Sequence, residues 1–335
     1  MNADLAAALA AARRAPIATT PRDEIHRDGK LALYRYRALA RPANAAPVLI
    51  VYALVNRPSV LDLQPDRSLI RRLLEAGLDV YLIDWGYPDG ADRFTSLADY
   101  LTVQLHASVD AVSRATGRAA LNLLGVCQGG TFAACYAAMY PERVRNLITM
   151  VTPIDFHTQD DLLSKWLRRI DVAAWIGEAN VSGDTLNRLF LSLMPFRLLQ
   201  QKYLKLLAGA PDPQRLENFM RMERWIFDSP DLAGTALREF ATWFYQENRL
   251  LHGGLAIGGR AVSLANVRQP VLNLYGARDH LVPPAASAAL ERLIGTTDYT
   301  GRELDLGHIG MYVSERAQRQ VPALIAEWLT CRRRR

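Results

Sequence analysis

Apolar residues come in short continuous runs, separated by segments in which they recur at helical spacing. Val48–Val55 (VLIVYALV) and Leu78–Asp84 (LDVYLID) are β-branched and aromatic runs, typical of strands buried on both faces of a parallel sheet. Leu31–Arg37 alternates apolar and polar residues, which predicts an outer strand. Four later segments extend the series of predicted strands: Ala119–Val126, Val144–Thr152, Pro270–Gly276 and Thr297–Leu304.

Helical periodicity fills the intervals between these strands. The predicted helices are Arg67–Ala76, Leu97–Thr116, Thr131–Met139, Ala285–Leu293 and Glu315–Leu329. Gly77 and Gly117 stand where the first two helices should stop. Strands and helices that alternate in this way predict βαβ units, and therefore a mostly parallel sheet with helices on both faces.

The alternation stops between about residues 155 and 259, where we find no buried strand signal. Tryptophans and other aromatic residues recur there at helical spacing, which predicts a helical insertion packed over the sheet as a cap. The predicted organisation is an N-terminal arm (1–30), a first part of the α/β core (31–154), the cap (155–259), a second part of the core (260–330) and a basic tail (331–335).

Composition narrows the class of protein. The chain has 335 residues, 50% of them hydrophobic and 22% charged, which is the balance of a globular protein with a sizeable core. Three cysteines are too few for a disulfide scaffold. The apolar run Val48–Val55 is far shorter than the roughly 18–20 residues that a membrane helix needs. These features exclude disordered, disulfide-rich and membrane-spanning classes.

The net charge of +6 is concentrated at one end of the chain. Arg332–Arg335 supply four positive charges, so the rest carries 36 basic and 34 acidic residues, or +2. A nearly neutral body does not indicate a nucleic-acid-binding protein. The basic run is typical of a solvated tail, or of an electrostatic contact for an anionic partner. Met1–Ala15 reads as a short helix or frayed arm, and its charge order is wrong for a secretory signal, so we expect a cytoplasmic protein.

The strongest chemical signal is the sequence G-V-C-Q-G around Cys127, between a predicted strand and a predicted helix. This is the context of the nucleophile elbow, in which a strained turn presents the nucleophile above the sheet. The start of the helix would stabilise a thiolate and a developing oxyanion, and the backbone N–H of Gln128 would donate to that oxyanion. Taken alone, the motif is equally compatible with a small buried cysteine in a βα turn.

Two later residues complete a possible triad. Asp279 follows the predicted strand Pro270–Gly276, and His308 follows the last predicted strand, which gives the chain order nucleophile, acid, histidine. The alternatives are purely structural roles, in which Asp279 caps the next helix and His308 is a turn residue. We interpret His280 as structural support that points elsewhere.

Other residues compete less well for these roles. Asp298 and Asp305 are weaker candidates for the acid, and Cys135 is expected in the core. A cysteine nucleophile exchanges readily with a thioester, and an acyl-cysteine is a good donor to an alcohol. The predicted reaction is therefore acyl transfer from a thioester such as an acyl-CoA through a covalent intermediate.

Several longer motifs resemble a known family over most of the chain, from about Leu31 to Leu329. The motifs are VYALVNRP (51–58), YLIDWGYP (81–88), the Cys127 box, 146–155, MERWIFDSPD (222–231), DHLVPP (279–284) and GHIG (307–310). They resemble the short catalytic subunit of class III polyhydroxyalkanoate synthases, with class IV as a relative, on an α/β-hydrolase fold. The chain departs from the family in a shorter stretch before Leu31 and in Leu306.

This resemblance implies a polymerase of (R)-3-hydroxyacyl-CoA, chiefly 3-hydroxybutyryl-CoA, in which Cys127 carries the acyl group. His308 would deprotonate Cys127 and assist the incoming hydroxyl. The family's aspartate is assigned mainly to activating the 3-hydroxyl, a role that Asp279 would inherit. The oxyanion donors would be the N–H groups of Gln128 and Val55.

The resemblance also implies partners. Neither a metal nor a cofactor is needed, since the CoA thioester is the substrate. A second, non-catalytic synthase subunit, a homodimer or larger assembly, and attachment to polymer granules are expected. Two alternatives remain open at this point: a cysteine-dependent thioesterase or hydrolase of the same fold, and a non-catalytic granule-associated homologue.

Overall fold

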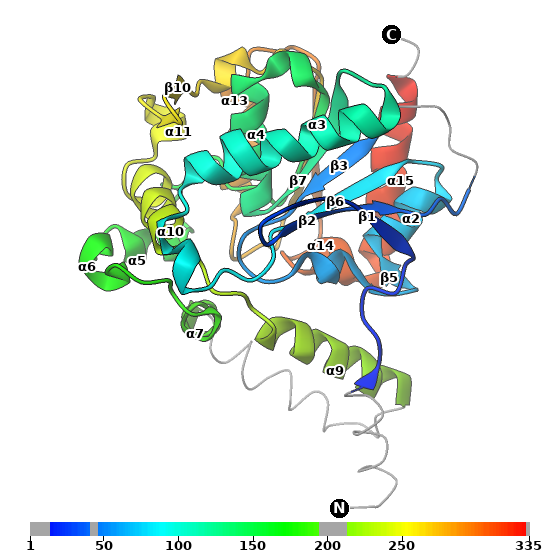
Figure 1. Cartoon of the computed structure of the whole chain (residues 1–335), viewed down its shortest axis with the longest axis horizontal. Helices are drawn as coiled ribbons and strands as arrows, with labels where there is room; N and C mark the ends of the chain where they lie inside the picture. The colour runs from blue at the N-terminus through cyan, green and yellow to red at the C-terminus, as the bar shows by residue number, and fades with distance from the viewer. Residues whose placement is uncertain (1–13, 41–45, 194–212, 333–335) are drawn as a thin grey trace, which may run out of the picture.

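An eight-stranded sheet forms the centre of the molecule (Figure 1). The computed structural model describes residues 14–40, 46–193 and 213–332, so most of the predicted arm at 1–15 and the tail beyond Arg332 lie outside it. The strands are, in spatial order, β1 (Arg22–Asp28), β2 (Leu31–Tyr36), β6 (Val80–Asp84), β3 (Val48–Val51), β7 (Leu121–Val126), β8 (Val144–Met150), β11 (Val271–Gly276) and β12 (Tyr299–Leu304). The pairs β1–β2 and β2–β6 are antiparallel and all others are parallel, so the predicted mostly parallel sheet is confirmed.

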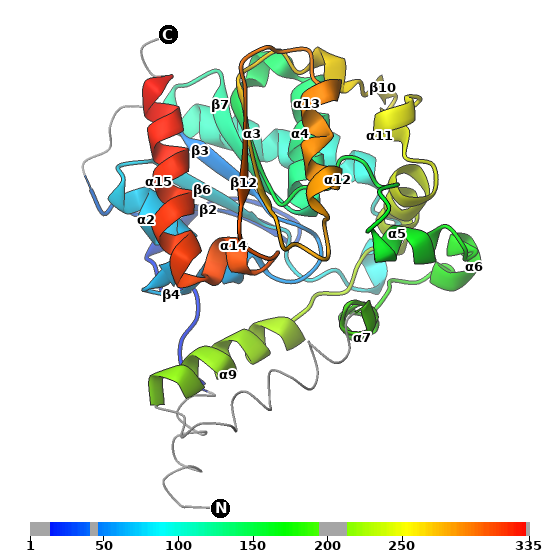
Figure 2. The ribbon, with the colours of Figure 1, turned by 180° about the vertical axis from the view of Figure 1, so that it is seen from behind.

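Helices cover both faces of this sheet, as Figures 1 and 2 show from opposite sides. The core helices are α2 (Leu69–Glu75), α3 (Leu105–Thr116), α4 (Gln128–Met139), α12 (Pro284–Ala288), α13 (Leu290–Leu293), α14 (Gly310–Val313) and α15 (Glu315–Cys331). Strand β3 shows why both faces are needed. Leu49 and Val51 pack in one buried cluster with α3 and α4, whereas Val48 and Ile50 pack in a second cluster with α2 and α15. Its four residues are fully buried, so the strand reads as a continuous apolar run.

Short elements connect these layers. They are the strands β4 (Asp62–Gln64) and β5 (Arg67–Ser68), the 3₁₀ helices η1 (Pro58–Leu61), η2 (Gly90–Phe94), η4 (Pro141–Arg143) and η7 (Leu264–Asn266), and the π-helical turn η3 (Asp99–Gln104) that leads into α3.

The predicted helical segment between 155 and 259 lies beside the sheet edge at which the parallel strands end (Figure 1). Its described elements are α5 (Leu162–Leu167), α6 (Val172–Ile176), α7 (Gly183–Leu193), α9 (Pro213–Phe227), α10 (Gly234–Phe240), the π-helical turn η6 (Ala241–Gln246) and α11 (Arg249–His252). A two-residue hairpin, β9 (Ala256–Ile257) and β10 (Arg260–Ala261), follows α11.

Hydrogen bonds tie this cap to the core. Trp225 Nε1 on α9 donates to the Arg57 carbonyl at 2.7 Å, and Tyr87 Oη donates to Asp228 Oδ1 at 2.7 Å. Asn180 Nδ2 donates to the Asp89 carbonyl at 2.6 Å. The cap is therefore anchored at separate points along the loops that follow β3 and β6.

Three boundaries differ from those predicted. β1 lies within residues 1–30, where we expected an arm outside the core, and it makes β2 the second strand rather than the outer one. None of the seven β1 residues is buried, so the strand has no apolar pattern to detect. The run Val48–Val55 is a strand only to Val51, which leaves residues 52–56 as a loop. Helix α4 begins at Gln128, three residues before the predicted start.

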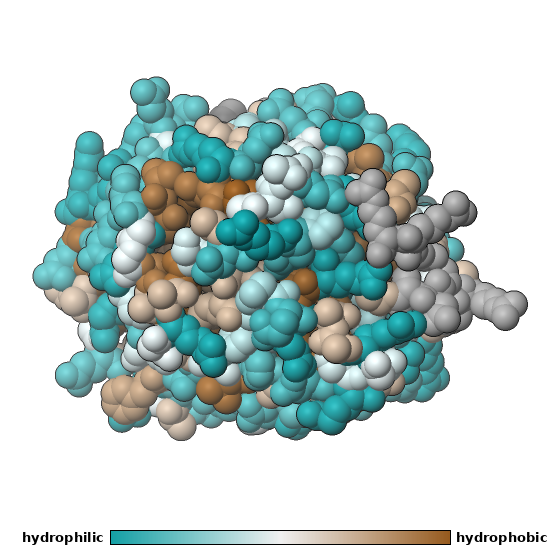
Figure 3. Space-filling view, turned by 90° about the horizontal axis from the view of Figure 1, so that it is seen from above, coloured by the Kyte–Doolittle hydropathy of each residue, from teal (hydrophilic) through white to brown (hydrophobic). Residues whose placement is uncertain are grey.

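The surface agrees with the composition. The face seen in Figure 3 carries mainly hydrophilic side chains, with apolar ones gathered into smaller patches. Within residues 14–40, 46–193 and 213–332, no helix is long and apolar enough to cross a bilayer.

Candidate active site

Cys127 occupies a strained turn between β7 and α4. Its φ of 54° and ψ of −128° lie outside the regions that residues with a side chain usually adopt. The turn is held by Cys127 N–H, which donates to the Met150 carbonyl at 2.9 Å, and by the close packing of the neighbouring glycines. A Cβ on Gly129 would collide with the Val51 carbonyl oxygen, and one on Gly125 would collide with Gly130. The structure thus has the strand–turn–helix context predicted for the motif.

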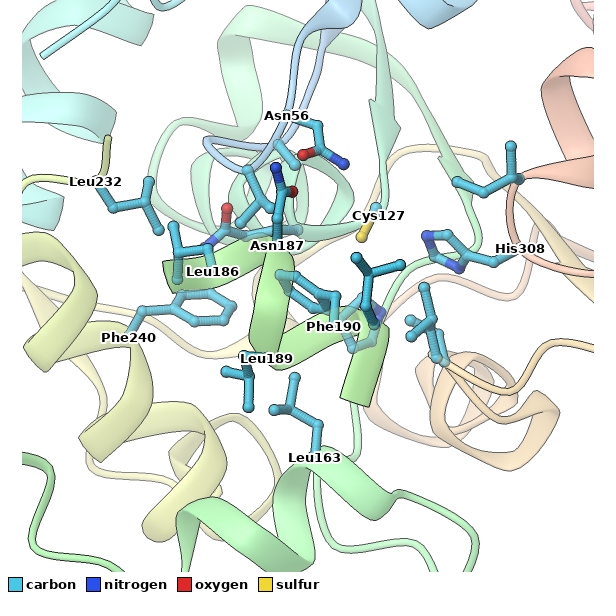
Figure 4. A pocket seen from close by; sticks show the side chains of 18 of the residues that line it. Asn56, Cys127, Leu163, Leu186, Asn187, Leu189, Phe190, Leu232, Phe240 and His308 are labelled. Carbon is cyan, nitrogen blue, oxygen red and sulfur yellow. The ribbon is translucent and has the colours of Figure 1, made fainter. Parts of the chain in front are cut away.

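His308 and Asp279 form a buried pair next to this turn. His308 Nδ1 lies 2.7 Å from Asp279 Oδ2, and the two side chains are 4% and 0% exposed. The other oxygen, Asp279 Oδ1, accepts the backbone N–H groups of Leu281 and Val282, each at 2.9 Å. Because both oxygens are engaged, Asp279 is fixed and His308 presents Nε2 toward the cavity. Figure 4 shows the His308 ring and the Cys127 sulfur facing each other.

The pair is electrostatically coupled to Cys127. Burial alone lowers the pKa of His308, but the negative charges of Asp279 and Cys127 and hydrogen bonds to both raise it. The net result is a pKa well above the ordinary value. An imidazolium in this position stabilises a thiolate on Cys127, which is the reactive form of a cysteine.

Gln128 and Val55, the two predicted oxyanion donors, both lie in the wall of the cavity that contains Cys127. Gln128 is the first residue of α4, so its N–H has no partner within the helix. The Gln128 side chain reaches the loop after β3, where its Oε1 accepts the N–H of Leu54 at 3.0 Å. This bond fixes the loop next to Val55, the other predicted donor.

That cavity, of about 360 Å³, lies between the sheet edge and the cap. Core loops contribute Cys127, Gln128 and His308, while the cap contributes mainly apolar side chains. Among the apolar lining residues are Leu163, Leu167, Trp175, Leu186, Leu189, Phe190, Met222, Trp225, Ile226, Leu232 and Phe240. A site of this kind suits an acyl chain and disfavours water.

The remaining candidates fall into two groups. His280 lines the cavity, so the interpretation that it points elsewhere is wrong. Cys135 is fully buried in the core, as predicted, and burial raises the pKa of its thiol to about 12. Asp305 pairs with Arg278 and Arg316, and Asp298 pairs with Arg332, so neither is the partner of His308.

Sequence reasoning missed several polar residues of the cavity wall. Asn56 follows Val55 and has a φ of 59°, and Asn187 comes from α7 in the cap. Tyr245 belongs to the π-helical turn η6, a type of irregular turn often found at functional sites. Burial raises the pKa of Tyr245, and negative charge on Asp161 and Cys127 raises it further. Asn56 lies within the VYALVNRP motif (51–58), a local signal from which it could have been found. Asn187 and Tyr245 have no such local signal, because only the packing of the cap brings them to the cavity.

Comparisons with known proteins agree with this geometry. A family profile described as the alpha/beta hydrolase fold matches residues 46–315. The poly(3-hydroxyalkanoate) polymerase subunit PhaC of Allochromatium vinosum is 50% identical over 313 residues, which cover 92% of this chain and 88% of that protein. The chain belongs to the PhaC polymerase family. The family resemblance predicted from the sequence is therefore confirmed, and so is the α/β-hydrolase fold.

Other PhaC relatives match over a similar span. The subunits named PhaC from Thiocystis violacea and a Synechocystis species are both 47% identical, covering 88% and 84% of their own lengths and 92% and 93% of this chain. Solved structures show the fold alone. A putative lipase from Sulfolobus solfataricus has a TM-score of 0.60 at 13% identity, with 93% of each chain covered. A monoacylglycerol lipase from Paleococcus ferrophilus has a TM-score of 0.56 at 19% identity, covering 89% of this chain and 98% of that one.

Proposed function

We propose that this chain is the catalytic subunit of a polyhydroxyalkanoate synthase, an acyltransferase that polymerises (R)-3-hydroxyacyl-CoA, chiefly 3-hydroxybutyryl-CoA. The observation that carries the proposal is the placement of Cys127 opposite the buried His308–Asp279 pair in an apolar cavity. The 50% identity to a PhaC subunit gives the substrate class.

Acylation begins with attack of the Cys127 thiolate on the thioester carbonyl. The N–H groups of Gln128 and Val55 stabilise the oxyanion that develops. The carbon–sulfur bond to CoA then breaks, the CoA sulfur takes the proton held by His308, and an acyl-Cys127 thioester remains. Thiol replaces thiol in this step, so little driving force is needed.

Elongation uses a hydroxyl as the acceptor. The 3-hydroxyl of a second acyl group attacks the carbonyl of acyl-Cys127, and His308 takes the hydroxyl proton. An ester bond forms, the bond to Cys127 breaks, and the thiolate is regenerated. The apolar lining of the cavity excludes the competing acceptor, water.

Asp279 acts on both steps through His308. It is not one of the residues that line the cavity, and both of its oxygens hold hydrogen bonds. A hydroxyl is far less acidic than a thiol, so elongation depends more strongly on the basicity that Asp279 gives to His308. This accounts for the role in hydroxyl activation that the family resemblance assigns to the aspartate.

The proposed reaction uses no cofactor and no metal. The relatives are named as subunits, which supports a complex with a second synthase subunit. A homodimer, and a cytoplasmic location at the surface of polymer granules, belong to the same proposal.

The test is incubation of the purified chain with 3-hydroxybutyryl-CoA, with and without a candidate second subunit. Polymer with release of CoA is expected. Release of CoA with free hydroxy acid would indicate a thioesterase, and failure to acylate Cys127 would indicate a non-catalytic homologue. Cys127→Ser should abolish turnover, because a hydroxyl is a far weaker nucleophile than a thiolate. The control Cys135→Ala, at a fully buried position of α4, should retain most activity per folded molecule.

A further inference from the structure

Two amide side chains meet in the cavity wall near Cys127, and neither has a role in the proposed acylation step. Asn56 belongs to the core loop after β3, and Asn187 belongs to cap helix α7. Figure 4 shows both amides on the side of the cavity where the Cys127 sulfur lies. Asn56 holds a left-handed backbone, with a φ of 59°, directly after the predicted oxyanion donor Val55.

Ser229 joins these two amides. Its hydroxyl Oγ lies 2.8 Å from Asn187 Oδ1 and also contacts Asn56 Oδ1. Asn187 is only 5% exposed, yet its Nδ2 has no hydrogen-bond partner among the described residues. An unpartnered amide group in an apolar wall costs stability, which points to a ligand that satisfies it.

The number of hydrogens on Ser229 limits how the two amides can be oriented. A serine hydroxyl has one hydrogen and can donate to only one of the two amide oxygens. The other amide must turn its NH₂ group toward Ser229 Oγ. If Asn56 Oδ1 accepts from Ser229, then Asn187 donates to Ser229 and keeps a free oxygen, while Asn56 keeps a free NH₂ group. The opposite choice exchanges the two roles. The Ile226 carbonyl is a third acceptor, but at 3.3 Å it is farther from Ser229 Oγ than either amide oxygen. Whichever of the two nearer amide oxygens accepts the hydroxyl hydrogen, the pair offers one free acceptor and one free donor.

We propose that Asn56 and Asn187, coupled through Ser229, bind the oxygen at carbon 3 of the acyl chain. The free amide oxygen accepts the hydroxyl of a 3-hydroxyacyl group, and the free amide N–H donates to the ester that forms on this same oxygen in a growing chain. The surrounding side chains of α7, Leu186, Leu189 and Phe190, are apolar and hold the hydrocarbon part. The inference rests on the proposed function and assigns the selection of hydroxylated acyl groups to these residues.

The experiment compares two thioesters in a single turnover. 3-Hydroxybutyryl-CoA and butyryl-CoA both offer a carbonyl to Cys127, and only the first has an oxygen at carbon 3. Rapid-quench release of CoA gives the acylation rate for each. We expect the wild-type protein to prefer the hydroxylated thioester, and Asn187→Leu to reduce that preference by about 3- to 10-fold, the effect of one neutral hydrogen bond.

The chain offers a matched control in Asn180→Leu. Asn180 also bonds the cap to the core, through the Asp89 carbonyl, but it does not line the cavity. This variant should keep the wild-type preference even if its stability falls. An equal loss of rate with both thioesters in Asn187→Leu would show a merely structural role and overturn the inference.

Two further outcomes keep the inference testable without that variant. A wild-type protein that acylates equally fast with both thioesters would overturn it, even if Asn187→Leu did not fold. A wild-type protein that is acylated by neither would instead overturn the proposed function, and this inference with it.

Discussion

The two carboxylate oxygens of Asp279 bind different partners in the site. One oxygen is fixed by the N–H groups of Leu281 and Val282, and the other holds His308 Nδ1 at 2.7 Å. The imidazole is thereby kept in one orientation with Nε2 toward Cys127. At the scale of single residues, each group of the site is fixed by the one before it, from Asp279 through His308 to the Cys127 sulfur.

Replacing the carboxylate should separate the two halves of the reaction. In Asp279→Ala, His308 loses the charge that raises its pKa, but the Cys127–His308 pair that acylation needs stays in place. We expect a burst of about one equivalent of CoA and an acyl-Cys127, followed by little polymer. Rapid-quench assays with mass measurement of the Cys127 peptide provide the test. Absence of both burst and acyl-Cys127 would show that acylation needs Asp279 equally.

The pH dependence of alkylation at Cys127 offers a second check. Asp279 raises the pKa of His308, so the imidazole stays protonated to a higher pH than an ordinary histidine. In Asp279→Asn the pKa of His308 falls, so less imidazolium faces Cys127 at neutral pH, and alkylation of Cys127 by iodoacetamide should be about tenfold slower there. A Cys331→Ser background removes the exposed thiol that would otherwise react. An unchanged alkylation profile would contradict the coupling.

The residues of this chain were unequally visible from the sequence. Cys127 and Asp279 could be predicted because each follows a strand with an apolar run that is easy to recognise. His308 follows β12, which has no apolar run, and was predicted from its place after the acid in the chain order. Parallel strands bring the three strand ends together. Asn187 and Tyr245 could not be predicted, because they reach the cavity only through the packing of cap helices. His280 was misplaced because chain neighbours can point to either side of a loop.

Individual elements depend on how closely backbones approach. The start of α4 packs against the end of β3 so tightly that Gly129 has no room for a Cβ next to Val51 and Tyr52. That approach sets the distance between the Gln128 N–H and the loop that carries Val55. The sharp start of α4 was predicted too late because Gly129 and Gly130 are poor helix residues, a preference that tertiary packing overrides.

A single methyl group should therefore disturb this element. Gly129→Ala should lower the free energy of unfolding by about 1–3 kcal/mol, because the new Cβ displaces backbone rather than a flexible side chain. It should also slow acylation by shifting the Gln128 N–H. Urea unfolding and burst kinetics measure the two effects. Gly90→Ala, where the added Cβ meets open space, is the control and should leave both near wild-type values.

Strand β1 could not be predicted from the pattern of hydrophobic residues. Its sequence, RDEIHRD, has a single apolar residue, Ile25, and it pairs with β2 through backbone bonds and through Arg22, which donates to Tyr36 Oη. Strands of the sheet interior, such as β3, were predictable because both faces are buried. An edge strand that packs little hydrophobic surface leaves no such record in the sequence.

Across the described parts of the molecule, the cap and the core meet around the cavity and are joined by several direct hydrogen bonds. The indole of Trp225 is one of them, since it is 2% exposed and donates to the Arg57 carbonyl. Arg57 in turn pairs with Asp84 at the end of β6, at 2.6 Å. Cap position is thereby linked to the loop that carries Val55 and Asn56.

Trp225→Phe tests this link. It removes the donor and leaves a carbonyl without its partner, which should cost about 1–3 kcal/mol and also reduce polymerisation. Trp328→Phe is a matched control. Trp328 lies on α15, away from the cap, and its Nε1 donates to Thr300 Oγ1 at 3.2 Å. Thermal unfolding and turnover should separate the two: both variants lose stability, and only Trp225→Phe loses activity. Equal activity in both variants would show that the hydrogen bond from Trp225 to Arg57 does not contribute to activity.

The polar edge strand β1 affects how readily copies of the molecule associate through the edge of the sheet. A free strand edge offers unpaired backbone groups that a second chain could extend into a continuous sheet. On β1 the outward-facing positions carry charged side chains, with Arg27 paired to Glu24 and Asp23 paired to Arg37 of the segment after β2. Stacking another β1 against this edge would disturb these ion pairs and strip the charged side chains of water. The strand that adds least to the core thus protects the molecule from edge-to-edge aggregation.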